Sequence, residues 1–323
     1  MTESSIRRFA QRRHFAAPRQ YVVYAAAGLI FVLFAVVLRD DGFVTVSNLL
    51  NIGRQAAPIA VMAVGMAFAL GAAEIDLSIG SVAALSSLVV ADAVGSFGFA
   101  AGVAITLAIG VGIGAVNGLI AVKVRIPSFL VTLGTLGIVS GIARNLNNLQ
   151  SLPIRNAAYL NVFGAGSLGP ISSLLIWTVI VGVVGHLVLH HLRWGRHVLA
   201  VGADRSAAGA LGIKTDRVRI TALIASASAA SLAGMLLAGR LAIGRHDLGE
   251  NLLLTVIAAV VIGGTNLFGG RASVAGAIAG SIVMAMLNNG LILMGLRVAD
   301  QLIARGVIII LAVALSMREH KEA

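Results

Sequence analysis

The sequence Gly71-Ala-Ala-Glu-Ile-Asp-Leu-Ser-Ile-Gly80 places two acidic residues, Glu74 and Asp76, between two long apolar runs. A carboxylate at membrane depth costs about 2.5–3.5 kcal/mol on insertion scales and rarely faces lipid. We expect these side chains to face a water-filled cavity, to pair with a cation, or to cap a helix that starts near Ser78. The segment therefore predicts a break between two helices. The break either lines a substrate path or gate, or forms a capped turn at the cytoplasmic edge.

The composition is that of a protein solvated by lipid. Hydrophobic residues make up 58% of the 323 positions, charged residues make up 11%, and the mean hydropathy is +0.96. A soluble chain of this length could not bury so much apolar surface. The 38 glycines suit close helix packing in a bilayer. Cysteine is absent, which excludes disulfides and cysteine-based metal sites.

The net charge of +11 does not indicate a nucleic-acid-binding protein. Basic residues stand at the ends of the apolar runs, and aromatic residues that could stack on bases make up only 5% of the chain. We interpret the charge as an orientation signal for membrane insertion.

The apolar runs predict an all-α, polytopic transmembrane bundle of about ten helices, since one crossing needs about 20 residues. The third and eighth runs are short, which predicts broken or buried helices. Residues 67–84 and 260–276 share a pattern of apolar helix, glycine-rich break and small-residue helix, as repeats in transporters do. The ten runs are residues 21–38, 56–73, 80–94, 97–122, 128–144, 171–192, 220–243, 252–264, 272–289 and 298–316.

The distribution of basic residues predicts that both chain ends are cytoplasmic, because this topology puts most lysines and arginines inside. Residues 1–20 then form a basic cytoplasmic tail, residues 21–316 a single transmembrane permease domain, and residues 317–323 a second cytoplasmic tail. The first run resembles a signal peptide, but Arg39 rather than a small-residue cleavage site follows it. We expect it to remain as an uncleaved helix.

Two loops exceed the length that a turn needs. Residues 145–170 are expected outside, and residues 193–219 form a basic cytoplasmic loop that is partly helical at its alanine-rich part, residues 206–211. Long ordered loops often dock partners, while the alternative is a solvated tether.

Other polar residues allow two interpretations each. Asn117 stands among Gly110, Gly114 and Gly118, whose spacing predicts a helix-packing ridge. Asn288 and Asn289 either hydrogen-bond a polyol or end a helix. The candidate residues of the substrate path are Glu74, Asp76, Ser78, Asn117, Asn288 and Asn289.

Catalytic and nucleotide-binding motifs are absent from the sequence. Residues 209–215 approach a phosphate-binding loop but have the wrong spacing, and no nucleophile elbow or zinc motif occurs. His186, His190 and His191 lack an acidic partner nearby, so we expect no metal site there. We expect no catalysis and no cofactor on this chain. If ATP drives transport, another chain must bind it.

Several linked motifs resemble the ribose-type permeases, the membrane subunits of bacterial ABC importers for simple sugars. The resemblance covers roughly residues 45–315. The motifs are Val61-Met-Ala-Val-Gly-Met66, Glu74-Ile-Asp-Leu-Ser-Ile-Gly80, Gly195-Arg-His-Val-Leu-Ala-Val-Gly202, Leu211-Gly-Ile213, Ile257-Ala-Ala-Val-Val-Ile-Gly-Gly264, Phe268-Gly-Gly270 and Leu287-Asn-Asn-Gly-Leu291.

The resemblance implies a type II importer fold in the bacterial inner membrane. It implies a cytoplasmic ATP-binding subunit, a periplasmic sugar-binding protein that docks on residues 145–170 and 240–250, and a second permease copy, identical or paralogous. Membrane lipid surrounds the assembly, and nucleic acid is not a partner. The ATPase closes and shifts the permeases between outward- and inward-facing states.

The resemblance also makes part of the basic loop the coupling segment, a short helix that seats in a groove of the ATPase. Family members often have an acidic residue where this chain has Arg205, so the contacts of that position differ here. The implied coupling residues are Gly195, Arg196, Gly202, Asp204, Arg205, Ser206, Ala207, Ala208, Leu211 and Gly212.

Three alternatives are less consistent with the sequence. A branched-chain amino acid permease is a related choice, but the string at residues 75–78 resembles the sugar branch more closely. An ion-coupled secondary transporter would need a buried carboxylate relay, whereas Glu74 and Asp76 lie in one segment. A membrane enzyme lacks a visible nucleophile–base pair. The identity of the sugar stays open.

Overall fold

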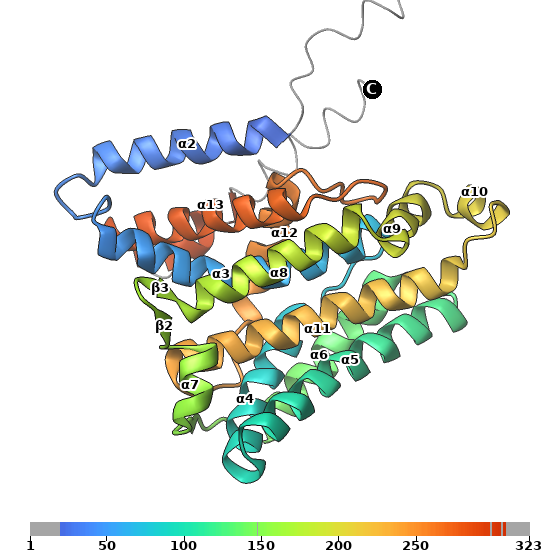
Figure 1. Ribbon diagram of the computed structural model, residues 1–323, viewed down its shortest axis with the longest axis horizontal. Helices are drawn as coiled ribbons and strands as arrows, with labels where there is room; N and C mark the ends of the chain where they lie inside the picture. The colour runs from blue at the N-terminus through green and yellow to red at the C-terminus, as the bar shows by residue number, and fades with distance from the viewer. Residues whose placement is uncertain (1–19, 147, 298, 305, 308–323) are drawn as a thin grey trace, which may run out of the picture.

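The computed structural model describes residues 20–146, 148–297, 299–304 and 306–307, which form a bundle of helices with four very short strands (Figure 1). The expected tails at residues 1–20 and 317–323, and much of the tenth run, lie outside the described residues, apart from Gln20. The elements are α2 (Gln20–Val37), α3 (Val46–Gly71), α4 (Ile79–Phe97), α5 (Phe99–Lys123), α6 (Ser128–Leu146), β1 (Leu152–Pro153), α7 (Ala157–Phe163), β2 (Ser167–Leu168), β3 (Ile171–Ser172), α8 (Ser173–His190), α9 (Arg193–Ala203), α10 (Arg205–Ala210), α11 (Thr215–Leu241), β4 (Ile243–Gly244), the 3₁₀ helix η1 (Glu250–Leu252), α12 (Leu253–Ile262) and α13 (Val274–Leu293).

Among the described residues, seven helices are long and apolar enough to cross a membrane: α3, α4, α5, α6, α8, α11 and α13. The third run is longer than its apolar stretch suggests, because α4 has 19 residues, but 78% of its most apolar part is buried, as one of the two predicted alternatives requires. The eighth run is short as predicted. Its helix α12 has 10 residues, which span about 15 Å at 1.5 Å per residue, or half of the hydrocarbon thickness.

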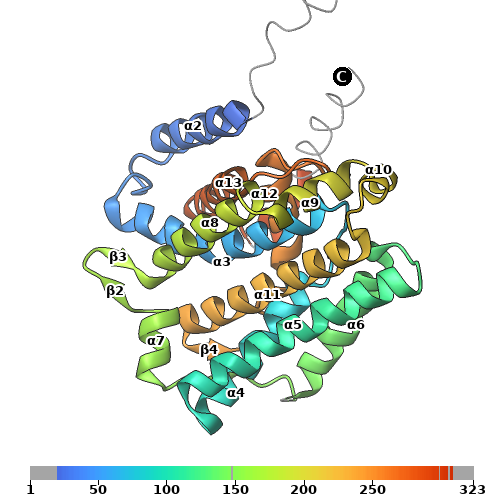
Figure 2. The ribbon, with the colours of Figure 1, turned by 45° about the vertical axis from the view of Figure 1, so that its right-hand side comes forward.

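Helix α11 runs through the middle of the bundle, with α5 and α6 on one side and α3, α8 and α13 on the other (Figures 1 and 2). The most apolar part of α3 is 83% buried, whereas that of α5 is 22% buried. The core therefore lies around α3, α4 and α11, and α5, α6 and α8 form the periphery.

The predicted glycine ridge of α5 is confirmed. A methyl group added at Gly114 would lie 2.6 Å from the Cα atom of Ile224, and one at Gly118 would lie 2.8 Å from the Cα atom of Ile220. At Gly110 it would lie 2.5 Å from the Cβ atom of Ser231. The three glycines therefore let the backbone of α5 approach that of α11 as close packing in a bilayer requires.

The two ends of the bundle differ in structure. The short helices α9 and α10 lie at one end, and α7 with the β2–β3 hairpin lies at the other (Figures 1 and 2). Tyr159 of α7 is buried and donates a hydrogen bond to the carbonyl of Met235 at 2.6 Å. Phe163 stacks on both Tyr159 and Trp177. The loop of residues 145–170 is therefore largely an ordered cap on the helices rather than a solvated tether.

Replacement of Gly114 by alanine should destabilise the folded chain by about 1–3 kcal/mol, because the added methyl overpacks the contact with α11. The matched control is Gly112→Ala on the same helix, where a methyl meets open space and helix propensity favours alanine. The measurement is the thermal midpoint of each purified variant in detergent. Equal midpoints for both variants would refute the packing role of the ridge.

Candidate functional site: a helix break held by buried polar groups

Helix α3 ends at Gly71 and α4 begins at Ile79, so residues 72–78 form the predicted break. The turn starts where the N–H groups of Ala73 and Glu74 donate to the carbonyls of Leu70 and Ala69, both at 2.9 Å. Ala73 has a φ of +59°, a conformation that few residues with a side chain adopt. These bonds end α3 and direct the chain back between the helices.

The extended part of the break obtains its hydrogen bonds from α6. The hydroxyl of Ser128 accepts from the N–H of Ile75 at 3.0 Å, and that of Thr132 accepts from the N–H of Leu77 at 3.0 Å. The Thr132 hydroxyl also lies 3.0 Å from the carbonyl of Ile75. Non-helical backbone at membrane depth requires such partners. Hydroxyl groups of α6 therefore supply the hydrogen bonds that a helical turn or a neighbouring strand would otherwise provide.

Three predicted residues, Asp76, Ser78 and Asn117, come together in one buried network. Asp76 is 0% exposed, and its Oδ1 accepts from the N–H of Ser78 at 3.0 Å and from its hydroxyl at 2.6 Å. The Asn117 amide donates to the Ser78 hydroxyl at 3.1 Å and accepts from the hydroxyl of Thr135 at 2.6 Å. Asn117 thus serves the network as well as the glycine ridge.

One side of this network has unused hydrogen-bonding capacity. Among the described residues, the Oδ2 atom of Asp76 and the hydroxyl of Ser226 are buried without a hydrogen-bond partner. The bonds from Ser78 form a local turn just before α4, whereas no side chain in the described part of the chain caps the N–H groups at the start of that helix. The second carboxylate oxygen takes no part in this turn, and the Ser226 hydroxyl lies close enough to the Asp76 carboxylate to interact with it.

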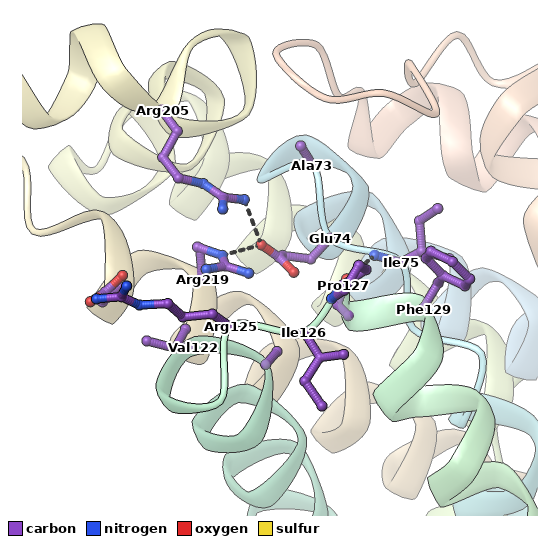
Figure 3. Close-up of a pocket in the computed structure, with 13 residues that line it drawn as sticks. Ala73, Glu74, Ile75, Val122, Arg125, Ile126, Pro127, Phe129, Arg205 and Arg219 are labelled. Atoms are coloured by element: carbon purple, nitrogen blue, oxygen red, sulfur yellow. Dashed lines mark hydrogen bonds and ion pairs between the residues drawn. The ribbon is translucent and has the colours of Figure 1, made fainter.

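Glu74 pairs with two arginines that sequence reasoning did not connect to it. It is 1% exposed, and its Oε1 accepts from Arg219 of α11 and, at 3.2 Å, from Arg205 of α10 (Figure 3). The three side chains line a cavity of about 620 Å³. Nothing in the local spacing could reveal these pairs, which join residues 131 and 145 positions apart.

The two asparagines of α13 lie elsewhere. The interpretation that they end a helix is wrong, because α13 continues to Leu293. Asn289 exchanges two amide hydrogen bonds of 2.9 Å with Asn48 and so ties α13 to α3. Asn288 lines a separate cavity of about 100 Å³ together with Gln55 and Arg240. The structure therefore does not bring these asparagines to the network of Asp76.

The predicted coupling loop is helical, as α9 and α10. Asp204 caps α10, and its Oδ1 accepts from the hydroxyl of Ser206 at 2.6 Å and from the N–H groups of Ser206 and Ala207 at 2.8 and 3.0 Å. The bond from the Ser206 hydroxyl, together with these N–H groups, holds the pKa of Asp204 below its ordinary value. Ala208 is buried, whereas Leu211 just after α10 is 83% exposed.

Glycines attach this loop to the bundle. A methyl at Gly195 would lie 2.2 Å from the carbonyl oxygen of Leu189 in α8, and one at Gly202 would lie 1.9 Å from the carbonyl oxygen of Gly71. The same oxygen of Gly71 accepts from the N–H of Gly270 at 3.2 Å. The end of α9, the end of α3 and the break between α12 and α13 therefore meet at one point. The remaining predicted residues are Arg196, which donates to the carbonyl of His191 at 3.2 Å, and Gly212, at a φ of +82°.

No metal centre is visible in the part of the chain that the structure describes, where no three His, Cys, Asp or Glu side chains lie together in a suitable group. The site offers hydroxyls, an amide and carboxylates instead. Such groups form hydrogen bonds to polar solutes.

A family model described as the permease component of branched-chain amino acid transport systems matches residues 48–313, which include all of these polar groups. The chain belongs to this permease family. Family membership makes it the permease subunit of an ABC importer, not an enzyme, and a multi-pass protein of the bacterial inner membrane.

The permease is similar along nearly its whole length to curated sugar permeases. It is 33% identical to the ribose import permease protein of Escherichia coli strain K12, over 96% of this chain and 98% of the relative. It is 34% identical to the ribose import permease protein of Bacillus subtilis strain 168, over 90% and 91%. It is 30% identical to the D-allose transport system permease protein of Escherichia coli K12, over 89% and 90%. No solved structure matches this permease.

Proposed function

We propose that this permease carries a simple sugar or sugar-like polyol across the inner membrane, driven by a separate ATPase. The observation that carries the proposal is the end-to-end similarity to ribose import permeases. The family description names branched-chain amino acids, but the similar permeases named above are those for ribose and D-allose. The amino acid alternative is therefore not favoured.

The topology proposed for the chain has ten helices and both termini in the cytoplasm. The end of the bundle with α9 and α10 is then cytoplasmic. Basic residues support this, because α5 ends at Lys123, α9 starts at Arg193, and Arg217 and Arg219 lie in the first turns of α11, all at that end (Figure 1). The α7 end is then periplasmic.

The substrate path is proposed to pass the break at residues 72–78. Asp76, Ser78 and Asn117 offer the carboxylate, hydroxyl and amide groups that bind sugar hydroxyls, and the second oxygen of Asp76 takes no part in the bonds to Ser78. These groups are buried in the present arrangement, so the path opens there only when α4 and α6 separate. A small number of polar groups is an advantage, because a path that binds its solute too tightly would release it slowly.

The coupling segment is proposed to be α10 with Leu211, which the ATPase groove would receive. An exposed leucine beside a short capped helix suits an apolar anchor at a protein interface. A periplasmic binding protein would dock on the opposite end. There, β1 pairs with β4, with Leu152 opposite Gly244, and so joins the two loops that were expected to receive it.

An ion-coupled mechanism is less consistent with the geometry. A proton relay needs carboxylates that gain and lose protons along the path. Glu74 contacts two arginines rather than another carboxylate or a histidine to which it could pass a proton. Asp76 alone does not make a relay across the bilayer.

Vesicles that hold the complete complex of permease pair, ATPase and sugar-binding protein should accumulate a pentose or hexose only when they contain ATP. An ATPase subunit with its catalytic glutamate replaced should abolish uptake while a proton gradient is maintained. The measurement is accumulation of radiolabelled ribose, allose and leucine. Accumulation without ATP hydrolysis would favour the secondary transporter, and accumulation of leucine alone would favour the amino acid permease.

Asp76→Asn separates the path role from the role in the turn before α4. Asparagine keeps the oxygen that accepts from Ser78 but loses the charge. A hydrogen bond to a charged group is worth about 1.5–3 kcal/mol, so uptake should fall about tenfold or more while the amount of assembled complex is unchanged. Asp76→Ala is the control that removes both functions. Normal uptake by Asp76→Asn would leave the turn as the only role of Asp76.

Leu211→Asp should weaken the permease–ATPase contact about tenfold or more, because it puts a charge where an apolar anchor is expected. The matched control is Leu168→Asp, which alters a leucine that is 75% exposed at the opposite end of the bundle. The measurement is the amount of ATPase that co-purifies with each permease. Equal recovery with both variants would show that the ATPase binds elsewhere.

A further inference from the structure

We infer that Glu74 is a positioning residue whose ion pair with Arg205 transmits the movement of the coupling helix α10 to the polar break at residues 72–78. This inference rests on the proposed function. It assigns to the Arg205 guanidinium a partner inside the permease, so that Leu211 and the remainder of the coupling segment, rather than this guanidinium, would hold the ATPase.

The pair connects two segments with different tasks. Arg205 is the first residue of α10, and Glu74 lies in the break two residues before Asp76. Figure 3 shows the guanidinium groups of Arg205 and Arg219 directed at the same carboxylate, while Arg125 extends away from it. The coupling segment thus reaches the break through this ion pair, and Ala208 of α10 also packs in the same apolar cluster as Ala72 at the start of the break.

The two arginines differ in burial, so the pair of Glu74 with Arg205 can separate more easily than the pair of Glu74 with Arg219. Arg219 is buried in α11 beside the buried carboxylate, so this pair must stay together to compensate both charges. The side chain of Arg205 is 48% exposed, so water can solvate it if it withdraws. The cavity of about 620 Å³ next to the pair gives α10 room to shift. Arg125 and Asp216 also line this cavity.

A displacement of Glu74 has a direct route to Asp76. Only Ile75 lies between them, and so short a stretch of chain has little slack to absorb a pull. Ile75 and Leu77 are fastened to Ser128 and Thr132 of α6, so movement of the break also moves α6. The close contact between Gly202 and Gly71 fixes the end of α9 against the end of α3. Helix α10 can then rotate about that fixed point.

The experiment uses the complete complex in vesicles and compares Arg205→Gln, Arg205→Lys and Arg217→Gln. Arg217 is an exposed arginine near the start of α11, two residues before Arg219, and serves as the matched control. We expect Arg205→Gln to lower uptake about tenfold, within the usual range of coupling between sites, and to lower the stimulation of ATP hydrolysis by sugar-loaded binding protein. Arg205→Lys keeps the charge and should retain most of both activities. Arg217→Gln should behave as the unaltered complex.

Co-purification of the ATPase distinguishes the link from a docking contact. Arg205→Gln should bind as much ATPase as the unaltered permease, in contrast to Leu211→Asp. The inference is overturned if Arg205→Gln loses the ATPase in proportion to its uptake, or if it transports normally. Neither result would affect the proposed function, which the uptake by the unaltered complex tests.

A double-mutant cycle adds a second criterion. If Glu74 and Arg205 act as one unit, Glu74→Gln and the double variant Glu74→Gln/Arg205→Gln should show the same uptake. Additive losses would overturn the inference. Glu74→Gln could fail to fold because Arg219 loses its counter-charge. In that case the comparison of uptake by the Arg205 and Arg217 variants still tests the inference.

Discussion

The structure depends on one constraint: the non-helical backbone of residues 72–78 is surrounded by apolar protein and must find hydrogen-bond partners there. Residues 72–78 leave the helical pattern where no water is assured, and each unpaired N–H or C=O there would be costly. Hydroxyls of α6 meet that need at Ile75 and Leu77, and the carboxylate of Asp76 meets it at Ser78. This requirement places α6 beside the break and brings Thr135 to Asn117. The polar network of the proposed path therefore follows from the way in which the chain satisfies its own backbone.

Close contact between backbones is the second condition. The ridge of α5 on α11 and the meeting of Gly71, Gly202 and Gly270 both occur where a side chain would collide with a neighbouring main chain. Lipid tails are as apolar as the helices, so such contacts rather than hydrophobic burial hold membrane helices together. At the α9 end they fasten the coupling loop to the end of α3. A loop held in this way can act as a rigid part of the bundle.

Local signals in the sequence predicted the parts of the fold that depend on neighbouring residues. Hydropathy located the helices, the spacing of Gly110, Gly114 and Gly118 predicted the packing ridge, and alanine content predicted the helix α10. Contacts between distant segments could not be read in this way. The pairs of Glu74 with Arg205 and Arg219, and of Asn289 with Asn48, depend on how the helices pack. Of the two interpretations of Asn289, the helix end is therefore wrong, because this residue forms a contact between two helices.

The two carboxylates of the break are separated by one residue but occupy different environments, and this difference bears on the source of energy. Glu74 faces arginines from α10 and α11, so its side chain ties the break to both of these helices. Asp76 faces hydroxyls and an unused hydrogen-bonding position, which suits contact with a neutral polar solute. Neither environment provides a chain of exchangeable protons across the membrane. This difference is consistent with the proposal that the work of transport enters from the side of α10, where Arg205 connects the break to the surface that a separate ATPase would contact.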